Sequence, residues 1–297
     1  MVSVIITTYK RSPEMLLRAI NSVRNQSYTD LEILIVDDSP SEFELRKDVR
    51  AAVENIDDSR ITYIPLERNS GGCVARNRGI NESKGEYITF LDDDDMYLPN
   101  KLELQVMALE KKPEAGWVSG YAYSCHIDDA GNILDKKLVK TQAHGGNVFD
   151  DLILDNYIPS VSAMVRREVL EKVGGFDENM PAGQDLDLWL RVAAVSELVV
   201  VEAPLIYQCI HKGERVTRSP EKKLKAYELI IEKNSEYMKS HPKAKAKYLL
   251  NQVKYLLWLQ QKNEAKKKLL ESCNLNSSKK CEYILRFLYW NMTYGRK

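Results

Sequence analysis

Four consecutive aspartates, Asp92 to Asp95, interrupt the largely apolar segment "ITFLDDDDMYLP" at residues 88–99. Adjacent carboxylates repel one another unless water screens them or a cation lies among them, and the apolar flanks argue against an open, fully solvated loop. Aspartate is also common in turns at strand ends, where runs of charge are usually solvated. The run therefore suits either a cation-binding site or an acidic turn.

The cation interpretation makes a specific chemical prediction. Mg²⁺ and Mn²⁺ take oxygen ligands, and Mg²⁺ typically combines one or two carboxylates with the phosphate oxygens of a substrate. If the strand continues through the run, Asp92 and Asp94 point to the same side. The pattern then predicts a nucleotide diphosphate ligand, and a cation bridging its phosphates would stabilise the charge on a departing diphosphate.

The run follows one of four short apolar segments that are typical of buried strands, at residues 2–9, 31–38, 60–66 and 86–93. Segments with helical spacing separate them, at about residues 13–26, 41–55 and 72–83. Strands and helices in alternation indicate right-handed βαβ units and predict an open α/β sandwich with a mostly parallel sheet. In such sheets, ligands bind beyond the carboxyl ends of the strands.

Three groups of polar residues fall at those carboxyl ends. Thr7 and Tyr9 close the first strand, Asp37 and Asp38 close the second, and the aspartate run closes the fourth. Because the ends of parallel strands meet at one edge of a sheet, this convergence favours one ligand site over three unrelated acidic turns.

Each of these residues also has a structural explanation. Tyr9 can stack on a nucleobase, or it can cap the core at a strand end. Asp37 or Asp38 can accept a hydrogen bond from a base or a sugar hydroxyl, or can cap the helix that follows. Arg76, in "GGCVARNRGI", can meet a phosphate or a base, or can remain on the surface. The residues alone leave these alternatives open.

Between residue 99 and a helical tail, the sequence predicts only a few helices and strands. A helix at about 99–111 and a strand at 115–127 lead into a less regular stretch, a helix follows within "GQDLDLWLRVAAV", and a last strand ends at His211. Further helices are predicted at residues 220–239, 243–262, 264–272 and 279–293.

The net charge of zero conceals an asymmetry within the chain. Residues 212–297 contain 21 lysines and arginines against eight glutamates, a net charge of +13, whereas residues 1–211 carry 22 basic and 35 acidic residues, a net charge of −13. Such a split suggests two parts that meet different partners.

The composition is that of a globular protein, with 44% hydrophobic and 29% charged residues. Five cysteines without Cys-x-x-Cys spacing argue against a disulfide framework or a zinc site and fit a reducing cytosol. No apolar run approaches the roughly 18 to 20 residues of a spanning helix, and no secretory signal pattern begins the sequence. We therefore expect a cytoplasmic protein.

Five segments in order resemble the family 2 glycosyltransferases of GT-A fold: "VSVIITTYKR", "ILIVDDS", "NSGGCVARNRGI", "ITFLDDDDMYLP" and "GGFDENMPAGQDLDLWLRV". The resemblance covers about residues 1–215. It implies a GT-A catalytic domain at 1–215, with a Rossmann-like mixed sheet and helices on both faces. Residues 216–297 would form a basic, amphipathic helical extension.

The resemblance also implies a reaction and a donor site. The reaction is an inverting transfer of a hexose from a nucleotide-diphosphate sugar, usually a UDP-sugar, to an acceptor hydroxyl. Matched to the family pattern, Thr7 and Tyr9 would line the base pocket, with Asp38 on the base and Arg76 beside the pocket. In the D-x-D motif, Asp92 or Asp93 would contact the ribose and Asp94 would hold Mn²⁺ or Mg²⁺, with Asp92 as a further candidate ligand.

Asp185 matches the acid that serves as catalytic base in the family's Glu-Asp pair. Here the pair reads Gln184-Asp185, so the first carboxylate is absent. The base would take the proton of the acceptor hydroxyl as it attacks the anomeric carbon. Asp185 also suits a structural role at a helix N-terminus, where negative charge is favoured. His211 matches a histidine that approaches the metal or diphosphate in the family, although a histidine at a strand end is often only polar surface.

Processive members of the family carry Gln-x-x-Arg-Trp and several membrane spans, and both are missing from this sequence. A single-addition enzyme is therefore expected. Its acceptor would be a lipid-linked or growing glycan, as in bacterial assembly of surface polysaccharides such as capsule or lipopolysaccharide.

The basic tail predicts a surface for a partner. Lysine clusters alternate with apolar segments such as "YLLNQVKYLLWL", a pattern that suits peripheral contact with anionic lipid at the inner face of the cell membrane. A helical partner interface and a lid over the core are the competing interpretations. No nucleic acid partner is expected, because no recognised binding motif accompanies the charge.

Two other functions compete with the glycosyltransferase. A sugar-phosphate nucleotidyltransferase would share the α/β nucleotide site, but it should carry a glycine-rich loop after the first strand, where this chain has "TTYKR". A catalytically silent protein that binds a nucleotide sugar or a partner is compatible with Gln184, while the presence of both Asp94 and Asp185 argues for catalysis.

Overall fold

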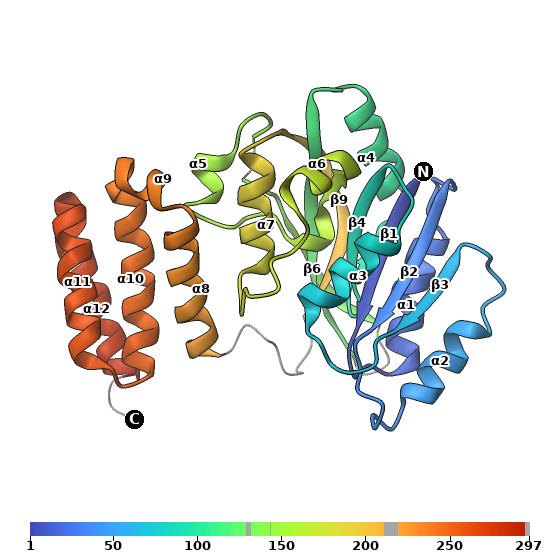
Figure 1. Cartoon of the computed structure of the whole chain (residues 1–297), viewed down its shortest axis with the longest axis horizontal. Helices are drawn as coiled ribbons and strands as arrows, with labels where there is room; N and C mark the ends of the chain where they lie inside the picture. The colour runs from blue at the N-terminus through green and yellow to red at the C-terminus, as the bar shows by residue number, and fades with distance from the viewer. Residues whose placement is uncertain (129–131, 143, 211–218, 295–297) are drawn as a thin grey trace. The chain divides into compact units, whose positions relative to one another are not determined.

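The computed structural model describes residues 1–128, 132–142, 144–210 and 219–294 (Figure 1). Residue contacts divide the chain into two compact units, one of Met1–Glu178 with Leu188–Lys212 and one of Asn179–Asp187 with Gly213–Lys297. The boundary that the sequence predicts between residues 215 and 216 lies outside the described residues.

Among the described residues, the first unit is built on a nine-stranded sheet in the order β3-β2-β1-β4-β8-β6-β9-β5, with β7 paired to β6. Parallel pairing joins β3, β2, β1 and β4, as the alternating pattern predicts, whereas β8 runs antiparallel to both β4 and β6. The sheet is therefore mixed, as the resemblance implies. Parallel pairing joins its first four strands and returns between β6 and β9, and the antiparallel pairings of β8 separate these two parts. The strands are β1 (Val2–Thr8), β2 (Leu31–Asp37), β3 (Ile61–Pro65), β4 (Tyr87–Asp92), β5 (Met96–Tyr97), β6 (Ala115–Ile127), β7 (Ile133–Val139), β8 (Met164–Arg166) and β9 (Glu197–Ile210).

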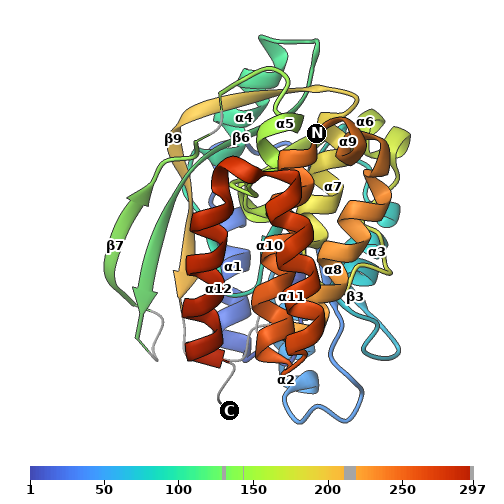
Figure 2. The ribbon, with the colours of Figure 1, turned by 90° about the vertical axis from the view of Figure 1, so that its left-hand side faces the viewer.

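Helices cover both faces of this sheet, with α1 and α3 on opposite sides (Figures 1 and 2). The alternation of side chains along β1 explains the arrangement. Val4 and Ile6 share one apolar core with Ile20 of α1. Ile5 points the other way, toward α3, where a Cβ on Gly79 would lie 2.4 Å from Ile5 Cγ2. The helices are α1 (Pro13–Arg24), α2 (Arg46–Glu54), α3 (Gly72–Glu82), α4 (Lys101–Glu110), α5 (Phe149–Leu152), α6 (Arg167–Val173) and α7 (Gln184–Ala193).

Two elements differ from the sequence prediction. Strand β7 lies in the stretch expected to be less regular, and all seven of its residues are exposed, so no buried face was there to give a period of two. Helix α2 begins at Arg46 rather than near residue 41. Before it the chain makes two turns, in which Phe43 N donates to Pro40 O and Arg46 N donates to Phe43 O, both at 3.0 Å.

The described tail in the second unit is helical, as predicted, although the single helix expected at residues 220–239 is divided into α8 and α9. Helix α10 packs against α8, α9, α11 and α12, and Figure 2 shows α10, α11 and α12 running side by side. Within the described residues, no helix has the length and apolar composition needed to cross a membrane. The helices are α8 (Pro220–Lys233), α9 (Ser235–Ser240), α10 (Pro242–Trp258), α11 (Lys262–Leu275) and α12 (Lys280–Tyr294).

Candidate functional site

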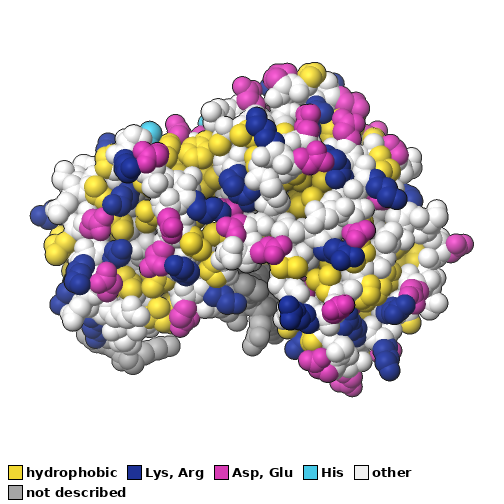
Figure 3. Space-filling model, in the orientation of Figure 1, with side chains coloured by type: hydrophobic (Ala, Val, Ile, Leu, Met, Phe, Trp, Pro, Cys, Tyr) yellow, Lys and Arg dark blue, Asp and Glu magenta, His cyan; other side chains and the backbone are white. Residues whose placement is uncertain are grey.

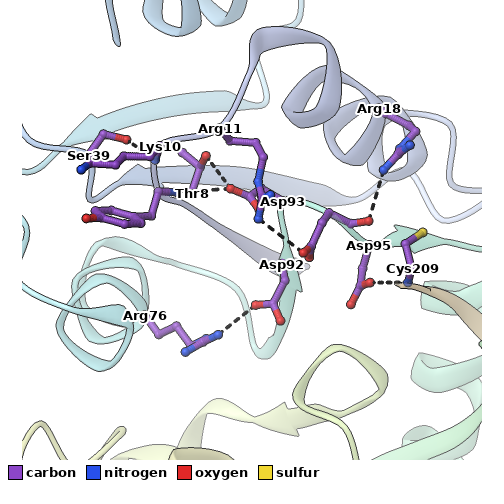
Figure 4. Close-up of polar contacts among 12 residues, drawn as sticks. Thr8, Lys10, Arg11, Arg18, Ser39, Arg76, Asp92, Asp93, Asp95 and Cys209 are labelled. Carbon is purple, nitrogen blue, oxygen red and sulfur yellow. Dashed lines mark hydrogen bonds and ion pairs between the residues drawn. The ribbon is translucent and has the colours of Figure 1, made fainter. Parts of the chain in front are cut away.

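The aspartate run forms a turn. Strand β4 ends at Asp92, and Asp95 N donates to Asp92 O at 3.1 Å. The strand therefore does not continue through the run, and the alternation that would point Asp92 and Asp94 to one side does not apply, because the chain turns between Asp92 and Asp95. The turn instead gives the four carboxylates separate environments, and Figure 4 shows those of Asp92, Asp93 and Asp95.

Asp93 points inward and ties the ends of β1 and β4 together. Its carboxylate accepts hydrogen bonds from Thr8 Oγ1 at 2.7 Å, Tyr9 N at 3.3 Å and Arg11 Nε at 2.9 Å, and the residue is 5% exposed. Burial raises the pKa of Asp93, and the Arg11 guanidinium opposes that rise. Asp93 was a candidate for contact with a ribose, but this geometry turns its oxygens away from the surface and leaves Asp92 as the accessible candidate.

Asp95 also points inward, toward β9. It is 4% exposed, and its Oδ1 accepts a hydrogen bond from Cys209 N at 2.8 Å. Burial raises the pKa of Asp95 well above its ordinary range, and the Asp92 and Asp94 carboxylates raise it further. The inward pair of aspartates thus fixes the turn to two strands that are distant in sequence.

Asp92 and Asp94 keep accessible carboxylates, with side chains 37% and 21% exposed. Arg76 Nη2 lies 2.8 Å from Asp92 Oδ1, and Arg11 Nη2 lies 3.3 Å from Asp94 Oδ2. The guanidinium of Arg76 also lies 5.4 Å from the ring centroid of Phe176. Each accessible carboxylate therefore has an arginine beside it, and together these groups can bind a ligand that carries phosphate and cation.

The donor set fits a hard divalent cation only in part. In the described ranges, no three histidine, cysteine or acidic side chains form a complete metal-ligand group. Asp92 and Asp94 can supply two carboxylate oxygens, and Mg²⁺ usually fills its other positions with water and substrate phosphate oxygens. The arrangement therefore fits a cation that arrives with a diphosphate better than a resident structural metal.

The end of β1 presents an aromatic ring beside this turn. Tyr9 is 43% exposed, and Lys10 follows with φ +49°, a conformation that residues other than glycine seldom adopt. Lys10 N donates to Ser39 Oγ at 2.9 Å, which holds this backbone to the loop after β2. Thr7 pairs in register with Asp92 across β1 and β4. Tyr9 and Thr7 are thus brought to the same sheet edge as the aspartate turn.

Asp37 and Asp38 lie at the end of β2 with their carboxylates engaged inside the protein. Asp37 is fully buried and accepts hydrogen bonds from Tyr63 Oη at 2.5 Å and Ser39 N at 2.9 Å. Asp38 accepts from the backbone at residues 70 and 71, at 2.6 and 2.8 Å, immediately before α3. Burial raises the pKa of Asp38, and those backbone hydrogen bonds oppose the rise. Contact between Asp37 and a ligand would require its internal hydrogen bonds to open.

Asp185 is the second residue of α7, in the unit that also holds the C-terminal helices. Its Oδ1 accepts from Leu186 N at 2.9 Å, and the preceding Gln184 donates through Nε2 to Met180 O at 3.2 Å. Gln184 thus donates a local hydrogen bond that an ionised glutamate at this position could not donate. His211, the other predicted residue of this part, lies outside the described residues.

Sequence reasoning missed the two arginines that hold the turn. Arg11 contacts both Asp93 and Asp94, and Arg18 Nη2 donates to Asp94 O at 3.2 Å. A signal for Arg11 was present, because basic residues directly follow Tyr9 in "TTYKR" and the aspartate run requires a counter-charge. Arg18 lies within α1 and gives no such local signal.

Comparison with known proteins matches the greater part of this sequence to one family. The sequence model of the family described as Glycosyl transferase family 2 matches residues 3–174. The putative colanic acid biosynthesis glycosyl transferase WcaA of Escherichia coli is 30% identical over 225 residues, which cover 75% of this chain and 77% of that protein. The putative teichuronic acid biosynthesis glycosyltransferase TuaG of Bacillus subtilis is 32% identical over 192 residues, which cover 65% and 71%.

The crystal structure of S. aureus TarS in complex with UDP-GlcNAc shares the fold. It matches with a TM-score of 0.65 and 14% sequence identity, covering 96% of this chain and 91% of that chain. The expected GT-A α/β fold with C-terminal helices is thereby confirmed.

The buried carboxyl of Asp95 yields a prediction about stability and pH. Because its pKa in the folded state is raised, ionising Asp95 costs stability as pH rises from about 4, its unfolded value, through the folded value. Asp95→Asn keeps an oxygen for Cys209 N and removes this cost. We expect the variant to match the wild type near pH 4 and to exceed it by about 1 to 3 kcal/mol at pH 7.5, measured by urea unfolding with chelator present.

Asp94→Asn provides the contrast, since its carboxylate is accessible and lies beside Arg11. Its loss should leave stability at pH 7.5 unchanged or lower by up to about 1 kcal/mol. An Asp95→Asn variant that is less stable than the wild type by the same amount at both pH values would contradict the assignment.

Proposed function

The chain belongs to glycosyl transferase family 2, and from that premise we propose that it transfers a sugar from a UDP-sugar to a hydroxyl of a glycan acceptor. The observation that carries the proposal is the convergence of Tyr9, the Asp92–Arg76 pair and the Asp94–Arg11 pair at the carboxyl ends of β1 and β4. Family membership disfavours the nucleotidyltransferase alternative. UDP as the nucleotide is supported by the likeness to TarS, whose structure was determined with UDP-GlcNAc.

The base, the ribose and the diphosphate of the donor would contact different residues at this edge of the sheet. The exposed ring of Tyr9 offers a stacking face for the base, and Thr7 lies beside it on the same strand end. Asp38 would support the base pocket, and Asp92 would accept a hydrogen bond from the ribose. Arg76 and Arg11 would contact the diphosphate, since guanidinium groups bind phosphate oxygens in pairs of hydrogen bonds.

Mn²⁺ or Mg²⁺ is the proposed cofactor, held by Asp94 with Asp92 as a second ligand. When bound, such a cation neutralises charge on the departing diphosphate. The accessible carboxylates support this assignment, and Asp93 and Asp95 do not belong to the ligand set because both are buried.

Transfer would proceed by a single displacement. The acceptor oxygen forms a bond to the anomeric carbon as the bond from that carbon to the diphosphate oxygen breaks, and the configuration inverts. The hydroxyl proton moves to the Asp185 carboxylate, and the diphosphate carries away the electron pair of the broken bond. Such transition states resemble an oxocarbenium ion, as in glycoside hydrolysis.

The acceptor and its location are inferred from chemistry and from the named relatives. WcaA and TuaG are named for colanic acid and teichuronic acid biosynthesis, which supports a surface polysaccharide as the product. We propose a lipid-linked or growing glycan as acceptor, reached from the cytoplasmic side with the enzyme bound peripherally to the membrane. The helices of the second unit supply a surface for that contact.

Helix α12 has an apolar face that the unit leaves uncovered. Tyr283, Phe287 and Trp290 pack into the core of the helical unit. On another side of α12, large apolar side chains are 38% to 66% exposed: Ile284, Leu285, Leu288, Tyr289 and Met292. We call these five residues the α12 stripe. Exposed apolar surface of this kind marks a binding site more often than chance.

The charge around the α12 stripe favours lipid over a second copy of the chain. Residues 212–297 carry a net charge of +13, so two copies meeting here would repel, whereas an anionic membrane would attract them. On the face of the helical unit that Figure 3 shows, lysine and arginine side chains are spread among apolar and acidic ones. Trp258 stacks on Tyr294 at 5.0 Å between centroids, and such aromatic rings suit the membrane interface.

Replacing the proposed base should separate transfer from binding. Asp185→Asn should lower kcat by about a hundredfold to ten-thousandfold while the Kd for UDP changes little, because general base catalysis contributes gains of that order. Transfer is measured with a UDP-sugar panel and purified glycan lipid, and Kd by calorimetry. Asp48→Asn, an exposed change on α2, is the control. Unchanged turnover in Asp185→Asn would refute the base assignment.

Removing the apolar side chains should weaken membrane contact. Leu285→Ser with Leu288→Ser should reduce co-sedimentation with vesicles rich in anionic phospholipid by about tenfold for each leucine that inserts. Leu270→Ser on α11, 64% exposed and outside the α12 stripe, is the matched control. Equal vesicle binding by the wild type, the double variant and Leu270→Ser would contradict the membrane role. If the wild type instead forms concentration-dependent dimers and the double variant is monomeric, the α12 stripe binds a second copy of the chain.

A further inference from the structure

The segment that carries the proposed base is grouped with the C-terminal helices. Residue contacts place Asn179–Asp187 in the same compact unit as Gly213–Lys297, while Leu188, the next residue of α7, belongs to the other unit. Asp185 thus belongs to the same compact unit as the helical tail. The sequence gives no hint of this, because the segment and the tail are separated by the whole of β9.

An ion pair between described residues joins the segment to the tail. Lys233, the last residue of α8, places its Nζ on Asp187 Oδ1, in the first turn of α7. Asp187 is 2% exposed, and the Lys233 side chain is 31% exposed. Each charge also lies where a helix dipole favours it, the anion at the N-terminus of α7 and the cation at the C-terminus of α8. The pair therefore links two helix ends with favourable polarity.

Other features fix the backbone around the same turn. Gly183 has φ +65°, the left-handed region that favours glycine, and it directly precedes α7. Met180 and Ala182 are 2% and 4% exposed, so alternate residues of the approach to the helix are anchored in the interior. Gln184 closes this approach through its hydrogen bond to Met180 O. With these constraints, a shift at Asp187 is transmitted to Asp185, which lies in the same helical turn.

We propose that Lys233 is a positioning residue for transfer: through Asp187, it holds the first turn of α7 so that the Asp185 carboxylate meets the acceptor hydroxyl. This inference rests on the proposed role of Asp185 as base. The C-terminal helices would then act in the transfer step as well as in the proposed contact with the membrane. A pair that served folding alone would affect stability without a selective effect on turnover.

The test compares three lysine variants of the full chain. Lys233→Met removes the charge and retains much of the side-chain length, and Lys233→Arg keeps the charge. Lys245→Met breaks a more exposed pair elsewhere in the helical unit, Lys245 with Glu271 at 2.9 Å, in which the lysine is exposed to a similar degree. The measurements are UDP affinity by calorimetry, kcat and acceptor KM, the pH profile of kcat, and thermal unfolding.

We expect Lys233→Met to bind UDP within about twofold of the wild type and to lose about tenfold to a hundredfold in kcat, the cost typical of a misplaced catalytic group. Lys233→Arg should recover most of that loss, and Lys245→Met should retain the wild-type kcat. If Lys233→Met does not fold, Asp187→Asn, which leaves no buried unpaired charge, should show the same loss of kcat with UDP binding retained.

Three outcomes would overturn the proposal. They are a folded Lys233→Met with wild-type kcat, an equal loss of kcat in Lys233→Met and Lys245→Met, and a loss that tracks thermal stability across all variants. Failure of the base assignment can be distinguished from failure of this proposal. It would show as full turnover in Asp185→Asn, whatever the kcat of the lysine variants.

Discussion

The buried carboxylate of Asp93 holds the site together. A buried charge is costly unless it is paired and hydrogen-bonded, and Asp93 meets that condition with the Thr8 hydroxyl, the Tyr9 backbone and the Arg11 guanidinium. All three donors come from the end of β1, whereas Asp93 follows β4, so this cluster fixes two strand ends in one geometry. The exposure of Tyr9 and the outward direction of the neighbouring carboxylates both depend on it.

Four adjacent carboxylates are tolerated because the turn divides them. Asp93 and Asp95 face inward to specific donors, and Asp92 and Asp94 face outward beside Arg76 and Arg11. The repulsion within the run is thus spread over separate partners instead of one shared cation. The same division suits the proposed function, in which the inward pair would keep the turn rigid and the outward pair, with its arginines, would bind the charged donor and its cation.

Much of the fold was predictable because burial leaves a periodic signal. The runs at β1, β2 and β4 and the apolar face of α1 follow directly from it, and the order of motifs indicated the family. Exposed β7 left no such signal. The directions of Asp92 to Asp95 depend on a turn closed by one backbone hydrogen bond, and the engagement of Asp37 depends on Tyr63, 26 residues away. The ion pair of Lys233 with Asp187 is longer in range still, so residue types and spacing could not reveal it.

Calorimetric titration with UDP, GDP and dTDP, each with Mn²⁺ and with chelator, tests the central claim most directly, namely that this turn presents two carboxylates and two arginines to a nucleotide diphosphate. We expect tight binding of UDP that requires Mn²⁺ and is lost in Asp94→Asn but retained in the surface variant Asp48→Asn. No binding of any nucleotide in the presence of Mn²⁺, or binding that survives both chelator and Asp94→Asn, would contradict it.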